Sequence, residues 1–255
     1  MSAYTDAVLA DDPFILYECN ALIEGSLALP DTSGNDFHAS WGGTPGTIGT
    51  TGPFGASLVM DENYNYIGVN AGGGGGDNVT FSANLWYSRT NPAASAGWDT
   101  MFGLSQLGAG LGLRLNGTAG AGGGAVDIFI QGVASILDFG VDIEDSEWHM
   151  YSWTKDGDDY AAYFDGELVG ETTDATAFNP GGNVVRIGAH YNGSATVDRA
   201  LGDIAMISFY TTPLGADRFA EYYELAFPTQ PGGAGAGAGG MPAALIADLS
   251  GGVRL

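Results

Sequence analysis

Short alternations of apolar and polar residues recur along the chain, separated by glycine-rich turns. In VTFSANLWYSRT (79–90) apolar residues occupy every second position from Val79 to Tyr87, and Trp86 falls on the opposite face. WHMYSWTKD (148–156) alternates in the same way. A period of two is typical of strands with one face in a core. The same pattern predicts further strands in 63–70, 98–106, 111–118, 125–132, 134–143, 183–190 and 202–212.

Two Asp-Gly pairs predict tight turns on either side of DYAAYFDG (159–166). Asp156-Gly157 follows one predicted strand, and Asp165-Gly166 precedes ELVGETT (167–173). Asp-Gly between alternating segments is a strong hairpin signal. Residues 29–60 are rich in Gly, Thr and Pro and predict mainly turns. Ten or more short strands joined in this way predict an all-β, antiparallel sandwich.

Helical patterning is confined to the two ends of the predicted sandwich. PLGADRFAEYYELAF (213–227) has apolar residues at helical spacing behind Pro213, which predicts one short C-terminal helix. The first 29 residues predict a helical turn followed by a strand. Trp86, Trp148 and Trp153 are expected to lie in the core.

Composition divides the chain into three parts. We expect one globular domain over 1–228, of which 1–12 form a lead-in segment. Residues 229–240 are rich in Gly and Ala and predict a flexible linker. The final segment, MPAALIADLSGGVRL (241–255), is apolar enough to dock onto another surface, and the alternative is a disordered tail.

Charge and hydropathy exclude several classes of partner. The formal net charge is −23 and Lys155 is the only lysine, so a nucleic acid is not expected to bind. The sequence contains no run of about 18 apolar residues, so no membrane-spanning helix is predicted. The N-terminus lacks the basic region of a signal peptide, so we expect synthesis in a cytoplasm. Cys19 has no partner for a disulfide, and its apolar neighbours predict a buried, inert thiol.

Four pieces of the chain together resemble laminin-G-like (concanavalin A-like) jelly-roll domains. They are LPDTSGNDFHASWGG followed by FGASLVMDENYNYIGV, the strand VTFSANLWYSRT, the hairpin WHMYSWTKDGDDYAAYFDGELVG, and the closing block of residues 184–223. The resemblance covers nearly all of 13–225 and implies that the sandwich is a jelly roll with one short C-terminal helix and an extended tail. Members of this family include lectins and glucanases.

The N-terminal segment SAYTDAVLADDPF (2–14) is similar to the openings of bacteriophage tail and virion proteins of this family. It carries their Tyr-x-x-x-Val-Leu-x-Asp-x-Pro pattern from Tyr4 to Pro13, although FILY (14–17) departs from their usual first strand. This resemblance implies a virion protein in a tail tip, fibre or capsid decoration. Copies are then expected to follow the symmetry of the particle, and the apolar tail to contact other virion proteins.

The family resemblance also implies one calcium ion. Asp31 and Asn35 lie in the matching Asp–Ser–Gly–Asn-type loop. The family's third ligand falls at Ala205, but Asp203 lies two residues earlier on the same strand face. Oxygen ligands of these kinds suit calcium. The alternative for residues 31–35 is a plain Asx turn.

Aromatic residues in or beside loops predict a sugar-binding surface, because such rings stack on pyranoses while amides bind hydroxyl groups. The candidate ligand-binding residues are Trp41, Tyr64, Tyr66, Trp98, Tyr191 and Asn192.

Catalysis is disfavoured by the distribution of acids and histidines. Glucanases of this fold carry alternating acids on one strand, and the nearest candidates here are Glu144, Asp145 and Glu147, which precede a strand and do not continue the series. The three histidines are isolated in sequence. The sequence therefore predicts a non-enzymatic virion structural protein with a lectin-like module for host glycans. The alternatives are a stand-alone carbohydrate-binding lectin domain and a polysaccharide hydrolase.

Overall fold

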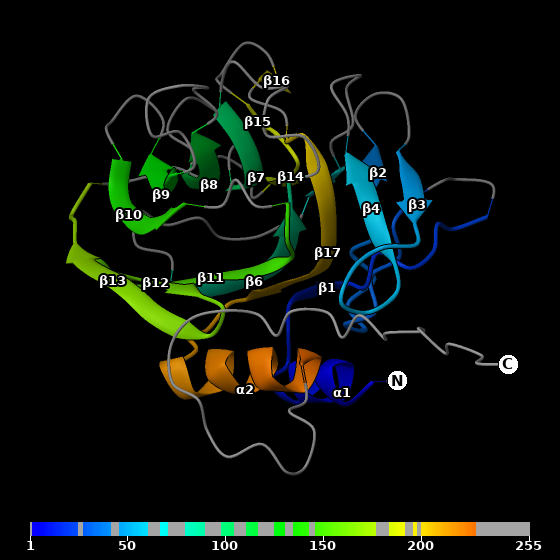
Figure 1. Cartoon of the computed structure of the whole chain (residues 1–255), viewed down its shortest axis with the longest axis horizontal. Helices are drawn as coiled ribbons and strands as arrows, with labels where there is room; N and C mark the ends of the chain where they lie inside the picture. The colour runs from blue at the N-terminus through cyan, green and yellow to red at the C-terminus, as the bar shows by residue number, and fades with distance from the viewer. Residues whose placement is uncertain are drawn as a thin grey trace, which may run out of the picture.

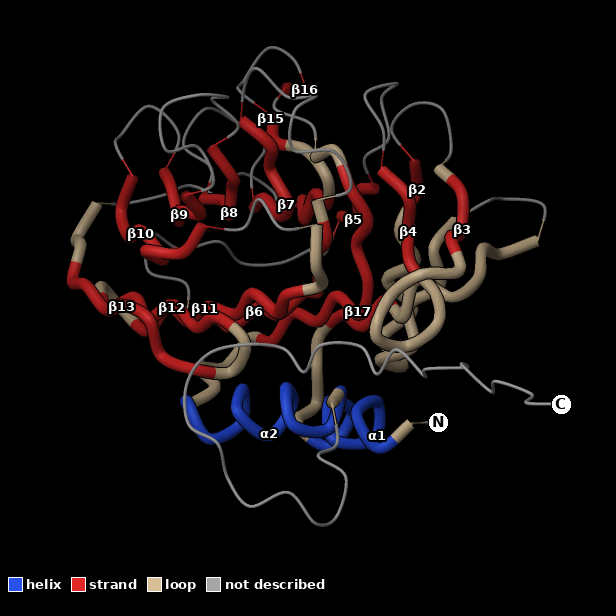
Figure 2. Tube along the Cα trace, viewed as in Figure 1, coloured by secondary structure: helices blue, strands red, loops and turns tan. Residues whose placement is uncertain are grey.

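The fold has three layers, two antiparallel β-sheets and a pair of helices (Figure 1). The computed structural model describes residues 2–24, 28–41, 46–60, 67–70, 80–89, 98–104, 111–116, 125–130, 135–142, 146–176, 184–191, 196–197 and 200–227. The helices cover the outer face of one sheet, which we call sheet I, and the other sheet, sheet II, lies on its far side (Figure 2). This confirms the predicted β-sandwich with a short C-terminal helix. No helix among these residues is long and apolar enough to cross a membrane.

Sheet I is built around the long central strand β6. Its strands run, in spatial order, β13 (Glu167–Thr173), β12 (Asp159–Phe164), β11 (His149–Asp156), β6 (Phe81–Ser88), β17 (Gly202–Tyr210), β4 (Ser57–Met60) and β3 (Thr47–Gly49), with β1 (Ile15–Tyr17) also paired to β17. Sheet II runs β10 (Ser135–Asp142), β9 (Ala125–Ile130), β8 (Leu111–Asn116), β7 (Trp98–Leu104), β14 (Val184–Ile187), β5 (Ile67–Asn70) and β2 (Ser40–Trp41). A small sheet pairs β15 (His190–Tyr191) with β16 (Thr196–Val197).

Three of these strands, β2, β3 and β4, lie in the stretch 29–60 that was predicted to form mainly turns, and the first two are the shortest. Both are short and sit at sheet edges, where backbone pairing with a single neighbour holds them. Edge strands of two or three residues have too few side chains to show a period of two. Their absence from the sequence prediction follows from that length.

The predicted alternation of β6 is confirmed, but both of its faces are buried. Phe81, Leu85 and Tyr87 belong to the core between the sheets. Asn84 and Trp86 point the other way, into a second core beneath the helices. Central strands covered on both faces bury every residue, as β6 does.

The second core separates the three tryptophans that were predicted to pack in the core. Trp153 lies between the sheets against Phe102, with ring centroids 5.0 Å apart. Trp86 is fully buried but lies under the helices, and Trp148 is half-buried beside that second core. The alternation correctly predicted on which face of its strand each tryptophan lies. It did not predict that helices distant in sequence cover the face that carries Trp86.

The two helices are α1 (Ala3–Ala10) and α2 (Ala216–Ala226). Ser2 caps α1 by accepting a hydrogen bond from the Thr5 backbone N–H at 3.1 Å. Tyr4 anchors α1 to sheet I, because its hydroxyl accepts hydrogen bonds from Asn84 Nδ2 at 2.7 Å and Trp86 Nε1 at 3.1 Å. The lead-in segment is therefore an integral part of the packed domain.

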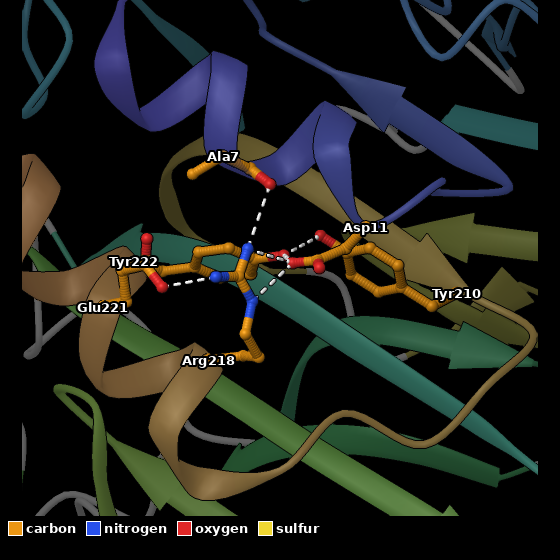
Figure 3. Close-up of polar contacts among 6 residues, drawn as sticks. All are labelled: Ala7, Asp11, Tyr210, Arg218, Glu221 and Tyr222. Atoms are coloured by element: carbon orange, nitrogen blue, oxygen red, sulfur yellow. Dashed lines mark hydrogen bonds and ion pairs between the residues drawn. The ribbon is translucent and has the colours of Figure 1, made fainter.

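A polar cluster joins the end of α1 to α2 and to β17 (Figure 3). The Arg218 guanidinium donates to Asp11 Oδ2 from Nε at 2.8 Å and from Nη2 at 2.5 Å, and to the Ala7 carbonyl at 3.3 Å. Tyr222 also donates to Asp11, and Tyr210 lies 2.9 Å from the Tyr222 hydroxyl. Burial raises the pKa of Tyr210 to about 12, so its hydroxyl stays protonated as a donor at neutral pH. The cluster fixes the two helices to each other and to the sheet.

The two Asp-Gly turns are found where the sequence predicts them. Gly157 joins β11 to β12 with φ +61°, and Asp165 and Gly166 join β12 to β13 with φ +50° and +83°. A side chain added at Gly166 would meet Tyr223 Cβ at 2.9 Å and Ala220 Cα at 3.0 Å, whereas Gly157 has open space around it. The second turn therefore supports α2 directly.

We expect Gly166→Ala to lower the free energy of unfolding by about 2–4 kcal/mol, from left-handed backbone strain and from crowding against α2. Gly157→Ala is the matched control, because it carries the backbone strain without the crowding and is expected to cost about 1–2 kcal/mol. Urea unfolding of both variants measures the difference. Equal costs for the two would show that α2 does not rest on this turn.

Cys19 is buried, as predicted. Its side chain is 1% exposed, and burial raises the pKa of the thiol to about 12. The reactive thiolate is therefore scarce at neutral pH, which fits a packing role.

Candidate functional site

Four polar side chains cross the outer face of sheet II in one row. Strand register places Thr100 of β7 opposite Arg114 of β8, Arg114 opposite Asp127 of β9, and Asp127 opposite Asp138 of β10. Their strand neighbours Leu113 and Ile128 lie in the core between the sheets. The row, Thr100, Arg114, Asp127 and Asp138, therefore points away from sheet I, and we call it the polar row.

The centre of the polar row is a charged pair stacked on an aromatic ring. Arg114 binds both carboxylate oxygens of Asp127, with Nε–Oδ1 at 2.8 Å and Nη2–Oδ2 at 3.1 Å. The guanidinium carbon lies 4.4 Å from the centroid of the Phe129 ring. Asp127 and Phe129 are almost fully buried, although they face away from the inter-sheet core. Bidentate pairing and stacking hold the arginine in one orientation.

Glycines face each other across the strands beside this pair. Gly103 of β7 lies opposite Gly112 of β8, and Gly112 lies opposite Phe129 of β9. On the other side Gly103 lies opposite Arg186 of β14. Glycine within a strand often marks a place where a ligand or another backbone approaches closely. The outer face of sheet II thus combines fixed polar groups with a buried aromatic ring that holds the half-buried Arg114 in place.

Two of the predicted ligand-binding residues start or end strands at this face. Trp98 is the first residue of β7 and pairs with Asn116, two residues from Arg114 along β8. Tyr191 is the last residue of β15, which lies against β7. Residues 98 and 191 are far apart in sequence, and the fold brings their strands together beside the polar row.

Of the other predicted ligand-binding residues, the structure describes only Trp41. Trp41 is half-buried and packs against the inter-sheet core, and its ring leaves no room for a side chain at Gly46. Tyr64, Tyr66 and Asn192 lie outside the described residues.

Asp31 has a structural position in its loop. One carboxylate oxygen accepts hydrogen bonds from the backbone N–H groups of Leu16 at 2.9 Å and Ser33 at 3.0 Å. The other accepts from Ser33 Oγ at 2.8 Å and the Phe37 backbone N–H at 3.0 Å. Asn35 donates to the carbonyls of Pro13 and Phe14. The loop is thus held by an extended Asx turn that ties it to the first strand.

Asp203 does not lie with Asp31. Leu16, whose N–H the Asp31 carboxylate accepts, pairs with Ser208 of β17, whereas Asp203 lies five residues earlier on the same strand. At the rise of an extended strand that separation is roughly 15 Å, too far for one ion to bind both carboxylates. The Asp203 carboxylate accepts from Thr51 Oγ1 at 2.9 Å, and burial raises its pKa. Within the described part of the chain, no three His, Cys, Asp or Glu residues form a metal-type group. Calcium binding stays a prediction, and Asp203 is not a partner for the Asp31 loop.

Where the structure describes the histidine and acidic residues considered for catalysis, their positions are explained by the fold. His149 Nδ1 lies 2.8 Å from Asp165 Oδ2, and the imidazole stacks on Phe164. Asp165 Oδ1 also accepts the Met150 N–H at 2.9 Å, so this group fastens the β11–β12 hairpin. Glu147 is exposed ahead of β11, and Glu144 and Asp145 lie outside the described residues.

A shallow acidic pocket of about 420 Å³ lies over the hairpins of sheet I. Asp156, Asp159 and Glu171 line it together with threonine residues, and Thr173 donates to Asp159 at 2.7 Å. Among the described residues that line the pocket, none is a lysine or arginine that would offset these charges. The outer face of sheet II, with its balanced pair and aromatic ring, is the better candidate for a neutral polar ligand.

Comparison with known proteins identifies the family. The laminin-G-type model of the concanavalin A-like lectin/glucanases superfamily matches residues 61–219. The chain belongs to this superfamily. No curated protein matches the sequence.

Solved structures of this concanavalin A-like fold resemble the chain at low sequence identity. Domain 4 of an extracellular arabinanase from Geobacillus stearothermophilus, in complex with arabinotriose, has a TM-score of 0.64 at 17% identity, over 83% of this chain and 98% of that one. The binding domain of botulinum neurotoxin serotype D has a TM-score of 0.60 at 14% identity, over 86% of this chain. A complex of that ligand-binding domain with N-acetylneuraminic acid has a TM-score of 0.59 at 14% identity, over 86% of this chain and 52% of that one. The chain spans about half the length of the neurotoxin structures, 52% in the first. At these identities the likeness establishes the fold.

Proposed function

We propose that this chain is a non-enzymatic carbohydrate-binding module that holds sugar on the outer face of sheet II. The observation that carries the proposal is the Arg114–Asp127 pair stacked on Phe129. Sugars present hydroxyl groups at their edges and apolar C–H surfaces on their faces. Phe129 is buried beneath Arg114 and fixes it, so the partly exposed guanidinium is the group that would bind sugar hydroxyls, and an aromatic residue at the edge of the row would stack on the sugar face.

Two further observations support a sugar ligand. Trp98 and Tyr191, which the sequence singles out for stacking, belong to strands that lie beside the polar row. Structural neighbours with this fold were solved with arabinotriose and with N-acetylneuraminic acid. Neither observation identifies the glycan that this chain binds.

The proposal of binding without hydrolysis rests on the hydrogen bonds that already occupy the carboxylates of the polar row. A glycosidase needs two acids across the scissile bond, one of them free to act as nucleophile or base. Both oxygens of Asp127 bind Arg114, and Asp138 accepts the Gly140 N–H at 2.8 Å. Release of reducing sugar from polysaccharides by the purified protein would instead support the hydrolase alternative.

A glycan array with the full chain, with and without calcium, tests the proposed function. The decisive variant is the double substitution Arg114→Met with Asp127→Leu, which removes both charges together at similar volume. We expect it to weaken binding at least tenfold, since about 1.4 kcal/mol of lost polar contact suffices for that change. Glu171→Gln, on sheet I, is the control and should bind normally. Silence of the wild type under both conditions, or unchanged binding by the double variant, would contradict the proposal.

We further propose that the module belongs to a bacteriophage structural protein of a tail tip, fibre or capsid decoration. Support comes from the lead-in pattern, whose Tyr4, Val8 and Asp11 all bond or pack within the domain. Genes for tail or capsid proteins are expected beside its gene. A neighbourhood of polysaccharide-degrading enzymes would favour the stand-alone lectin or hydrolase alternatives.

A further inference from the structure

Two exposed apolar side chains lie beside α2. Leu168 of β13 and Phe227 after α2 are exposed by 47% and 42%, and they are the large apolar side chains in the described residues with such exposure. Single exposed apolar residues are ordinary on protein surfaces. The informative feature is that both of these lie on the helix side of sheet I, beside α2.

Contacts around Trp86 connect these residues into one patch. Tyr223 stacks on Trp86 with ring centroids 5.9 Å apart, and Phe227 and Phe54 meet the same indole edge-on at 5.4 and 5.8 Å. Phe227 also lies 5.4 Å from Tyr223. Leu168 lies on the same side of sheet I, because it pairs with Tyr163, whose ring is 4.7 Å from that of Phe219 in α2. We call the group of Phe54, Leu168, Tyr223 and Phe227 the aromatic patch.

The last described residue, Phe227, is itself a member of the aromatic patch. The chain continues from it through the Gly- and Ala-rich linker into MPAALIADLSGGVRL (241–255). By the rule for Gly-rich chains, the 13 residues 228–240 have a root-mean-square span of roughly 20 Å, so residues 241–255 stay within reach of the patch. Such a tether gives the segment an effective concentration on the order of millimolar at this surface.

The chemistry of this segment fits the patch. Six of its residues are large and apolar, Met241, Leu245, Ile246, Leu249, Val253 and Leu255. Asp248 and Arg254 balance each other, so the segment is neutral in a chain of net charge −23. It is therefore not repelled by the acidic domain, and burial of its apolar side chains against exposed rings is favourable.

We propose that the aromatic patch is the docking site of residues 241–255. The bound segment covers Leu168 and Phe227 and completes the second core, which surrounds Trp86. The inference goes beyond the proposed function and does not depend on it, because the patch lies on the helix side of sheet I and the polar row lies on sheet II.

Photo-crosslinking of the full chain tests this docking. p-Benzoylphenylalanine in place of Leu168 puts the probe in the patch, and the same residue in place of the exposed Thr47 of β3 is the control position. After irradiation in dilute solution, mass spectrometry is expected to find crosslinks from position 168 into 241–255 and none from position 47. Crosslinks from position 168 only to other parts of the chain, or none, would overturn the proposal.

Variants of the segment provide the second arm. Leu245→Ser, Ile246→Ser and Leu249→Ser together should reduce the crosslink yield from position 168 at least fivefold. Asp248→Asn, a polar change in the same stretch, is the matched control and should leave the yield unchanged. Equal yields from both variants would show that apolar burial does not hold the segment, which also overturns the proposal. Glycan binding should be the same in all of these variants, so the two proposals fail separately.

Discussion

Tyr4→Ala is expected to lower the free energy of unfolding by about 4–6 kcal/mol. Removing a fully buried aromatic ring costs about 3–5 kcal/mol through lost burial and the cavity left behind. The ring contacts Phe54, Trp86 and Tyr222, with centroids 4.5, 6.4 and 5.8 Å away. Its loss also leaves the buried donors of Asn84 and Trp86 without their acceptor, at about 1–3 kcal/mol for each such group if water does not replace it.

Tyr4→Phe separates the two contributions. It keeps the ring and removes only the hydroxyl, so it is expected to cost about 1–3 kcal/mol. Thermal unfolding followed by circular dichroism measures both variants, and a domain of this size should lose about 2–4 °C in Tm per kcal/mol. A cost near zero for Tyr4→Ala would mean that α1 is not part of the cooperative domain, contrary to its packing.

Arg114→Met is expected to destabilise the protein by about 3–5 kcal/mol. The substitution leaves the Asp127 carboxylate, whose side chain is 7% exposed, without its counter-charge and its two hydrogen bonds. An isolated buried charge is costly because the protein interior solvates it poorly. The expected signature is a large fall in the urea midpoint without loss of the folded baseline.

The double variant of Arg114→Met with Asp127→Leu is the control for this effect. Replacing a buried ion pair by apolar residues of similar volume is often neutral or stabilising. We therefore expect the double variant to recover most of the stability that the single variant loses, while it still fails to bind glycan. A double variant as unstable as the single one would show that the cost comes from packing on Phe129 and not from the unpaired charge.

Much of the fold follows from local chemistry. Alternation in β6 and β11 depends on a period of two that any one strand displays by itself. The Asp-Gly turns depend on the positive φ that glycine tolerates, and both were found at the predicted positions. The helix α2 begins and ends close to the predicted bounds because Pro213 and a helical stripe mark it locally.

The candidate site was less accessible to sequence reasoning. Arg114 and Asp127 are 13 residues apart in sequence and lie in different strands. Only the register of β8 against β9 shows that they pair. The calcium prediction placed Asp31 with Asp203 by likeness of motif, but the pairing of β1 and β17 puts them far apart. Trp41 was predicted to be a loop aromatic. It packs against the core instead, because β2 pairs with β5 at the edge of sheet II, and no local pattern shows that pairing.

The amino-acid sequence by itself determined which segments are strands, which face of each strand is apolar, and where the chain turns. These are properties of neighbouring residues, and hydrophobic periodicity and backbone preference encode them directly. Only the tertiary structure decided that Trp86 packs under a helix pair, that Tyr4 anchors the lead-in, and that a charged pair faces outward on sheet II. Those outcomes depend on strand order and register, which bring together residues that no local pattern connects.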